Sequence, residues 1–161
     1  MCGIVGIVPK RTDRPDLLES LVRCMTQEIH HRGPNDAGFY ITPKIALGMA
    51  RLSIIDVGGS RQPIFTADRS QAIVFNGEIY NYRALRAEFQ QSGYSFGTQG
   101  DTEVALAAFH LYGKEGFKRL EGMFAIAIWD APTETLTLAR DWLGQKSIYY
   151  AETDLGWIFA S

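Results

Sequence analysis

The stretch Met123-Phe124-Ala125-Ile126-Ala127-Ile128-Trp129 decides the fold class of this chain, because all seven of its residues are apolar. A strand with one face in water alternates apolar and polar side chains, whereas a strand covered on both faces is apolar throughout. The stretch therefore predicts a strand buried inside a layered domain. Strand-like segments at residues 135–139, 147–150 and 157–160 follow it and are expected to be its neighbours.

The part of the chain before this stretch contains both helix-like and strand-like segments. Apolar residues recur at helical spacing between positions 17 and 29, after the helix start Asp13-Arg14-Pro15-Asp16 with its acidic cap. Gly33-Pro34 is expected to end this helix, and Cys24 is expected to pack within it. Two further helices are predicted at residues 82–91 and 101–112, and strands at residues 3–8, 39–42, 45–50, 52–55 and 72–75.

This order of strands and helices predicts two sheets that are covered by helices. The expected fold class is α/β, more narrowly α+β, in the form of a four-layer αββα sandwich of mainly antiparallel sheets. The chain has 161 residues, of which 46% are hydrophobic, and this is enough for one domain with a substantial core.

Charge and cysteine content exclude several classes of partner and site. Sixteen basic and eighteen acidic residues give a net charge of −2, and no run of Lys or Arg forms a basic stripe, so we expect no nucleic-acid or membrane partner. Two cysteines without a Cys-x-x-Cys pair argue against a disulfide framework and against a zinc site. A reducing cytosol fits this composition, and the first residues show no export signal, so we expect a cytoplasmic protein.

Cys2 stands directly after the initiator methionine and before an apolar run. Removal of Met1 would leave a thiol and a free α-amine on one residue, which are a nucleophile and a proton acceptor. Since an α-amine titrates near ~7.7 to 8.0, a useful fraction of it is unprotonated at neutral pH. The alternative is that Cys2 is only a packing residue of a buried first strand.

Asn76-Gly77-Glu78 follows the predicted strand at residues 72–75 and has two interpretations. Asn-Gly is the commonest type I′ hairpin turn, and for this segment alone that interpretation is favoured. In the other interpretation the Asn76 side-chain amide and the Gly77 backbone N–H converge on one point, as an oxyanion hole requires.

Arg51 and Asp101 are charged residues that also have two interpretations. Arg51 is either an exposed charge at a strand end or a bidentate clamp for a carboxylate. Asp101 is either the N-cap of the helix at residues 101–112 or a carboxylate that holds an ammonium group. The three histidines are too scattered for a metal site, and no metal is expected.

Six sequence blocks stand out across essentially the whole chain. They are Met1-Cys2-Gly3-Ile4-Val5-Gly6, His31-Arg32-Gly33-Pro34-Asn35-Asp36, Ala50-Arg51-Leu52-Ser53-Ile54-Ile55-Asp56, Phe75-Asn76-Gly77-Glu78-Ile79-Tyr80-Asn81, Asp101-Thr102-Glu103-Val104 and Leu120-Glu121-Gly122-Met123-Phe124-Ala125. Together they resemble the glutaminase domain of class II glutamine amidotransferases, and most strongly the N-terminal half of glutamine-hydrolysing asparagine synthetases. The resemblance implies an N-terminal-nucleophile (Ntn) hydrolase fold, which is an αββα sandwich.

The resemblance also implies a role for each matching residue. Cys2 would attack the side-chain amide of L-glutamine and form a γ-glutamyl thioester, releasing ammonia, while Asn76 and Gly77 would hold the oxyanion. Arg32 would brace the loop near Cys2. The residues that would bind the substrate are Arg51 at its α-carboxylate, Glu78 and Asp101 at its α-ammonium group, and Leu52, Ser53, Ile54 and Ile55 through backbone contacts.

The sequence also departs from the family pattern. Ser147 stands where proline is usual, although this touches no predicted catalytic residue. The chain ends at Ser161, inside a segment that continues in the family, and it lacks the ATP-dependent synthetase domain. The expectation is therefore a glutaminase domain over residues 1–161 that is truncated at its C-terminus.

The ammonia is expected to pass to an attached or separate synthetase domain, with asparagine formation as the leading expectation. ATP and Mg would enter only through that missing domain, and the glutaminase step would need no cofactor. A homodimer is a possible assembly. The alternative function is a non-catalytic glutamine-binding or scaffold module.

Overall fold

The computed structural model describes residues 2–11, 14–52 and 61–161 of the chain. The elements in chain order are β1 (Gly3–Pro9), α1 (Pro15–Glu28), η1 (His30–Arg32), β2 (Asp36–Ile41), β3 (Ala46–Arg51), β4 (Ile64–Phe65), β5 (Gln71–Ile79), α2 (Tyr82–Gln91), α3 (Asp101–Tyr112), η2 (Gly113–Arg119), β6 (Gly122–Asp130), β7 (Thr135–Arg140), β8 (Tyr149–Glu152) and β9 (Gly156–Ala160).

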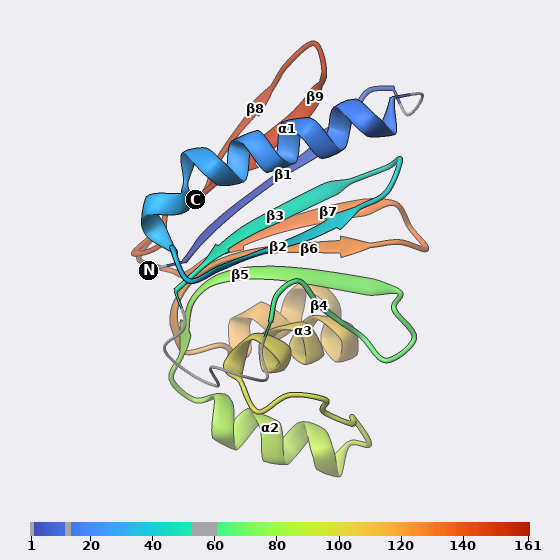
Figure 1. Cartoon of the computed structure of the whole chain (residues 1–161). Coiled ribbons are helices and arrows are strands. Elements are labelled where there is room, and N and C mark those ends of the chain that lie inside the picture. Colours follow the sequence, from blue (N-terminus) through green and yellow to red (C-terminus); the bar gives the residue numbers. More distant parts are fainter. Residues whose placement is uncertain (1, 12–13, 53–60) are drawn as a thin grey trace.

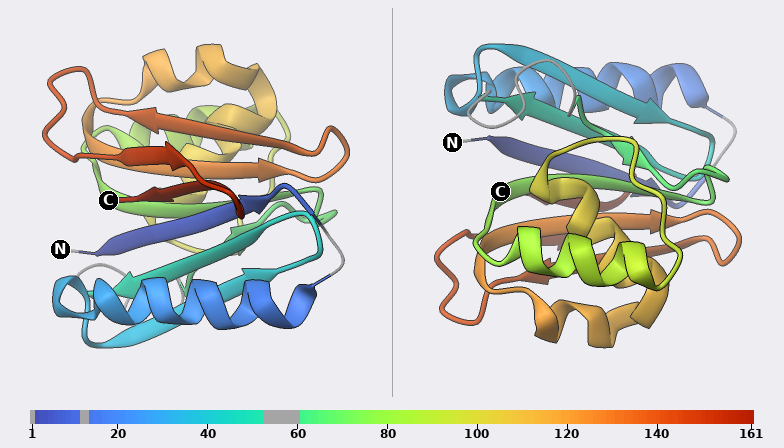
Figure 2. Two further views of the ribbon diagram at one scale, coloured as in Figure 1. Left: turned by 90° about the horizontal axis from the view of Figure 1, so that it is seen from above. Right: turned by 90° about the horizontal axis from the view of Figure 1, so that it is seen from below.

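The strands form two sheets in which every described strand pair is antiparallel. One sheet has the order β2-β3-β1-β9-β8, and the other has the order β4-β5-β6-β7. The two sheets lie face to face, with α1 on one outer side and α2 and α3 on the other (Figures 1 and 2). The predicted four-layer αββα sandwich is therefore confirmed.

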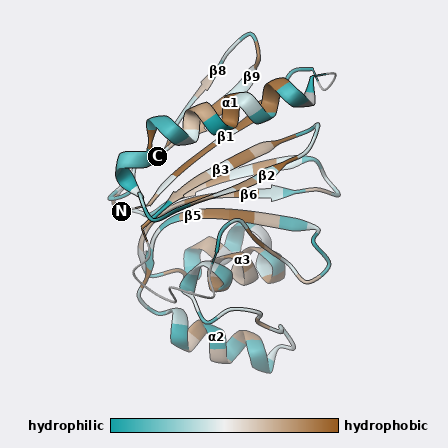
Figure 3. Ribbon diagram, in the orientation of Figure 1, coloured by the Kyte–Doolittle hydropathy of each residue, from teal (hydrophilic) through white to brown (hydrophobic). Residues whose placement is uncertain are grey.

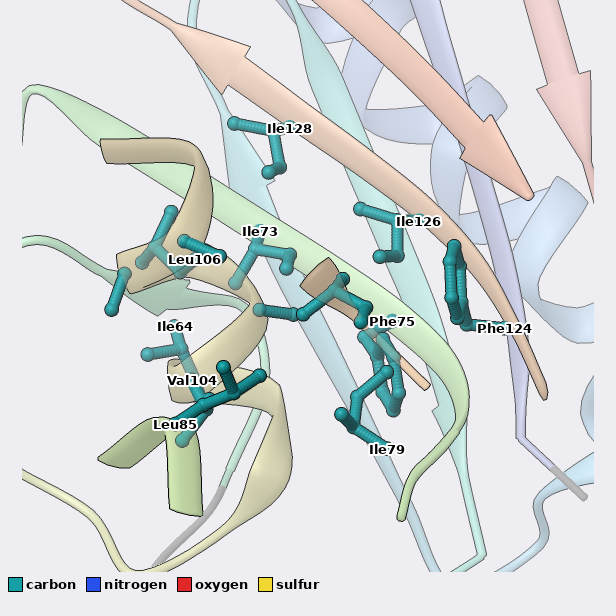
Figure 4. Close-up of a cluster of buried hydrophobic side chains, with 14 of the residues drawn as sticks. Ile64, Ile73, Phe75, Ile79, Leu85, Val104, Leu106, Phe124, Ile126 and Ile128 are labelled. Atoms are coloured by element: carbon teal, nitrogen blue, oxygen red, sulfur yellow. The ribbon is translucent and has the colours of Figure 1, made fainter. Parts of the chain in front are cut away.

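The side chains of β6 explain why residues 123–129 are apolar throughout. Phe124, Ile126 and Ile128 lie in the cluster that packs against α2 and α3 (Figure 4). The intervening residues Ala125, Ala127 and Trp129 lie in the cluster between the two sheets. Since successive side chains of a strand point to opposite faces, a strand in the middle of four layers buries both sets. Much of β5 and β1 is also hydrophobic, as the brown colour in Figure 3 shows, and most residues of both strands are buried.

Helix α1 covers the five-stranded sheet with an apolar stripe. Its side chains Leu18 and Val22 are buried together with Val5 and Ile7 of β1. Cys24 belongs to this helix as predicted, but it is exposed, so its predicted packing role is wrong. Position 24 lies two residues beyond Val22 and therefore points away from the sheet. Arg14, rather than an acidic residue, is the N-cap of the helix.

Two predicted strands differ from the observed structure, and one observed strand was not predicted. The strand predicted at residues 147–150 is β8 at Tyr149–Glu152, and all four of its residues are exposed, so no hydropathy pattern marks its register. The two-residue strand β4 is too short to show a period and was not predicted. Of the strand predicted at residues 52–55, Leu52 is not in a strand, and residues 53–55 lie outside the described residues.

No helix in the described part of the chain is both long enough and apolar enough to cross a membrane.

Candidate active site

A pocket of about 110 Å³ lies at the end of the sandwich where β1 and α3 begin and where β3 and β5 end. Its wall contains the three predicted catalytic residues, Cys2, Asn76 and Gly77. It also contains the predicted substrate-binding residues Arg51, Leu52, Glu78 and Asp101. The remaining predicted contacts, Ser53, Ile54 and Ile55, lie outside the described residues. Every predicted site residue that the structure describes is thus part of one pocket.

Cys2 is held at the head of the central strand of its sheet, because β1 pairs with β3 on one side and with β9 on the other. The Leu52 backbone N–H donates to the Cys2 sulfur at 3.4 Å, and the thiol is 3.6 Å from the Leu52 carbonyl oxygen. Arg32 Nε donates to the Cys2 carbonyl oxygen at 3.3 Å, which confirms the predicted bracing contact.

Asn76 and Gly77 lie within strand β5, so the interpretation of this segment as a hairpin turn is wrong. Gly77 pairs with Phe124 of β6, and the ladder continues for two more residues to Ile79. A Cβ atom at position 77 would overlap the Met123 carbonyl oxygen and would lie 2.7 Å from Phe124 Cα. Glycine is therefore needed here for the close approach of two strands and not for a turn.

The Asn76 side chain is buried, and its Nδ2 donates to Ser161 Oγ at 3.4 Å. The same hydroxyl accepts the backbone N–H of Ile4 at 3.1 Å, so it links β5 to the strand that follows Cys2. Because an amide NH₂ group carries two hydrogens, one bond to Ser161 leaves the second for another acceptor.

The Gly77 N–H lies on the edge of β5 that faces the pocket. On that edge the Phe75 N–H donates to Gln62 Oε1 at 2.7 Å, and the Ile79 N–H donates to Asp101 Oδ2 at 2.9 Å. Alternate residues of a strand direct their amides to the same edge, so the Gly77 N–H lies between these two bonds. The pocket wall thus contains the Asn76 side chain and the Gly77 backbone, which are the two groups named in the oxyanion-hole prediction.

Asp101 is the first residue of α3, and Gly100 is the N-cap, so the prediction that Asp101 caps the helix is wrong. Its carboxylate instead accepts the Ile79 N–H from the neighbouring sheet. Burial raises the pKa of Asp101 above its ordinary value; hydrogen bonds from the Ile79, Asp101 and Thr102 backbone oppose the rise, and the charge of Glu78 adds to it. A cation bound beside this carboxylate would relieve the cost of its burial.

Arg51 is the last residue of β3 and is buried, so the interpretation as an exposed surface charge is wrong. The pocket wall therefore contains one guanidinium group and the carboxylates of Glu78 and Asp101. Charges of both signs in one small pocket suit a ligand that carries an ammonium group and a carboxylate. Among residues 2–11, 14–52 and 61–161, no group of three His, Cys, Asp or Glu side chains could hold a metal ion.

The pocket wall also contains residues to which the sequence analysis gave no role. They are Gln62, Phe75, Gly100, Thr102, Met123 and Lys146. The Lys146 side chain is buried, and its backbone N–H donates to the Asp141 carboxylate at 3.0 Å. Lys146 stands directly before Ser147, where the sequence was compared with the family pattern, and that comparison is a signal that could have identified it. No comparable signal marks Gln62.

Comparisons with known proteins indicate the family of this chain. A family model described as a glutamine amidotransferase domain matches residues 1–161. All of the chain aligns at 43% identity with 26% of asparagine synthetase [glutamine-hydrolyzing] 1 from Bacillus subtilis. All of it also aligns at 35% identity with 29% of asparagine synthetase B [glutamine-hydrolyzing] from Escherichia coli. The chain therefore spans little more than a quarter of the length of these curated relatives.

A solved structure supports the fold. The chain superposes on glutamine phosphoribosylpyrophosphate amidotransferase from B. subtilis with a TM-score of 0.77 at 20% identity, over 99% of this chain and 41% of that one. Because the family model covers every residue, this chain belongs to the glutamine amidotransferase domain family, as the resemblance predicted.

Proposed function

We propose that this chain hydrolyses the side-chain amide of L-glutamine to glutamate and ammonia through a γ-glutamyl thioester on Cys2. The observation that carries the proposal is the pocket in which Cys2, the donors of Asn76 and Gly77, and the charged side chains of Arg51 and Asp101 lie together. Membership of the glutamine amidotransferase family supports the same substrate.

The reaction begins once Met1 has been removed, so that Cys2 carries a free α-amine. The amine takes the thiol proton as sulfur attacks the amide carbon of glutamine, and it then gives that proton to the departing nitrogen. The negative oxygen of the tetrahedral intermediate accepts hydrogen bonds from Asn76 Nδ2 and the Gly77 N–H. Ammonia leaves as the carbon–nitrogen bond breaks. Water then hydrolyses the thioester, which releases glutamate and restores the thiol.

Selectivity for free glutamine comes from holding both charged ends of the amino acid. Arg51 pairs with the α-carboxylate, and Glu78 and Asp101 pair with the α-ammonium group. Leu52 to Ile55 supply backbone contacts. An analogue that lacks either charged end loses one of these ion pairs, so the pocket binds it more weakly than glutamine.

The Asp101→Asn variant is expected to raise the KM for glutamine roughly 10-fold to 100-fold, the cost of losing a hydrogen bond to a charged group. The amide oxygen of asparagine can still accept the Ile79 N–H. A carboxyl group with a raised pKa destabilises the folded protein as pH rises through that pKa. Because the variant lacks this carboxyl group, its melting temperature at neutral pH is not expected to be lower than that of the wild-type protein. Steady-state kinetics together with thermal melting tests both statements.

The pH dependence of kcat/KM tests the same residue. Because the pKa of Asp101 is raised, acidification should protonate it and weaken glutamine binding at a higher pH than for an ordinary aspartate. In the Asp101→Asn variant, the acid limb of the profile should lack the fall in kcat/KM that protonation of Asp101 causes in the wild-type protein. An identical acid limb in both proteins would exclude Asp101 as the ammonium-binding carboxylate.

The ammonia is proposed to serve a synthetase domain, attached or separate, and aspartate is the proposed acceptor because the curated relatives carry the name of asparagine synthetases. The glutaminase step is proposed to need no cofactor, with ATP and Mg acting only in that synthetase domain. A reducing cytosol is the proposed location, since it keeps the Cys2 thiol free.

The direct test is glutamate release by purified protein whose N-terminus is Cys2. Equal amounts of glutamate and ammonia should accumulate from L-glutamine, while an analogue without the α-ammonium group should be left intact. Saturable binding of glutamine without release of glutamate would instead support the non-catalytic glutamine-binding module.

A further inference from the structure

The side chain of Gln62 takes the place of a neighbouring strand at Phe75, on the edge of β5. Strand β4 covers this edge only at Ala72 and Ile73. Two residues further along, Gln62 Oε1 accepts the Phe75 N–H at 2.7 Å, and Gln62 Nε2 donates to the Phe75 carbonyl oxygen at 3.2 Å. The side-chain amide therefore makes both hydrogen bonds that the peptide groups of a neighbouring strand would make.

The same side chain reaches the helix that carries Asp101. Gln62 Nε2 is 3.3 Å from Thr102 Oγ1, and Thr102 is the buried second residue of α3. Asp101 in turn accepts the Ile79 N–H. Gln62 and Asp101 thus hold the pocket edge of β5 at Phe75 and Ile79, two residues before and two residues after Gly77.

Packing holds both residues of this contact in place, Gln62 through its backbone and Phe75 through its side chain. A Cβ atom at Gly38 of β2 would overlap the Gln62 carbonyl oxygen and would lie 3.2 Å from Pro63 Cδ, so the backbone at residue 62 packs directly on β2. The Phe75 side chain is buried in the cluster beneath α2 and α3 (Figure 4). Because both residues are held by packing, the hydrogen bonds between Gln62 and Phe75 fix the position of β5 at Phe75.

We propose that Gln62 is a positioning residue for the oxyanion hole: by taking the place of a strand at Phe75, it keeps the Gly77 N–H directed into the pocket. The proposal rests on the proposed glutaminase function. Charge develops on the amide oxygen only in the transition state, so a displaced donor costs more in catalysis than in glutamine binding. Gln62 touches neither the thiol nor the reacting atoms in this account, and it acts through Phe75 and Gly77.

The experiment compares the variant Gln62→Leu with the control Gln71→Leu. Gln71 also lies on β5 and also loses side-chain contacts, from its Nε2 to Asp130 at 2.7 Å and from its Oε1 to His110 Nδ1 at 3.1 Å. It is at the far end of the strand from the pocket. A misplaced donor should lower the kcat of Gln62→Leu roughly 10-fold to 100-fold, whereas Gln71→Leu should keep the wild-type kcat. Dissociation constants for glutamine, measured in a Cys2→Ala background by calorimetry, should be unchanged by either substitution.

A second variant, Gln62→Glu, keeps an acceptor for the Phe75 N–H and removes the donor to the Phe75 carbonyl oxygen. Its second carboxylate oxygen would face the Phe75 carbonyl oxygen, so two acceptors would meet there. The kcat of Gln62→Glu should therefore also fall below that of Gln71→Leu, and this variant keeps the proposal testable if Gln62→Leu fails to fold. The inference is overturned if Gln62→Leu keeps the kcat of Gln71→Leu, or if glutamine affinity falls by the same factor as kcat. An inactive wild-type protein would instead overturn the proposed function.

Discussion

Replacing Cys2 with alanine is expected to abolish the release of glutamate from glutamine, with kcat falling by roughly 10⁴-fold or more. The alanine side chain cannot form the thioester, and the donors of Asn76 and Gly77 then have no tetrahedral intermediate to bind. The fold should persist, because Cys2 precedes β1, and the hydrogen bonds of its sulfur to the Leu52 backbone are long, at 3.4 and 3.6 Å. Glutamate assays and circular dichroism on the same preparation give both measurements.

The control for this variant is Cys24→Ala. Cys24 is the other cysteine of the chain and lies exposed on α1. Its replacement should leave kcat and KM unchanged. Continued glutamate release by the Cys2→Ala protein would refute the mechanism, whichever way the control behaves.

Replacing Asn76 with alanine is expected to lower kcat roughly 100-fold to 1,000-fold, the usual cost of removing one oxyanion-hole donor. The KM should change far less, because the amide oxygen of bound glutamine carries little negative charge before sulfur attacks. Loss of the bond from Asn76 Nδ2 to Ser161 Oγ should also reduce thermal stability, so kinetics must be measured well below the melting temperature.

Asn81→Ala provides the matched control for Asn76→Ala. Asn81 also makes side-chain bonds to the backbone, from its Nδ2 to the Arg119 carbonyl oxygen and from the Glu121 N–H to its Oδ1. It is not part of the pocket wall. Its replacement should cost stability without a comparable fall in kcat. Equal losses of kcat in the two variants would mean that Asn76 acts only through the fold.

Local sequence was sufficient to predict the long elements of this fold. Helices α2 and α3 have the predicted bounds, and each is followed by a glycine with positive φ, Gly93 or Gly113, which helps to determine where the helix ends. The hairpin interpretation of Asn76-Gly77 was wrong because turn propensity is a local preference, whereas pairing with β6 stabilises an extended backbone at every residue of β5. Strand β8 was misplaced by two residues because all of its side chains are exposed.

The composition of the pocket was predicted from motifs, but the contacts that shape it were not. Arg51 and Asp101 each permitted a surface interpretation, and only burial in the folded chain decides against it. Gln62 binds Phe75 and Thr102, which are 13 and 40 residues away in sequence, so no local pattern could predict its contacts. Such contacts depend on the packing of two sheets and a helix, which exists only in the folded state.

Mass spectrometry after exposure to a diazo ketone analogue of glutamine tests the central claim most directly. The account predicts a chain that begins at Cys2 and carries one covalent adduct, mapped by peptide digestion to the sulfur of that residue, with excess glutamine slowing the modification. The exposed Cys24 serves as an internal comparison and should stay unmodified. A protein that releases glutamate while Cys2 remains unmodified, or while Met1 is still attached, would contradict the account.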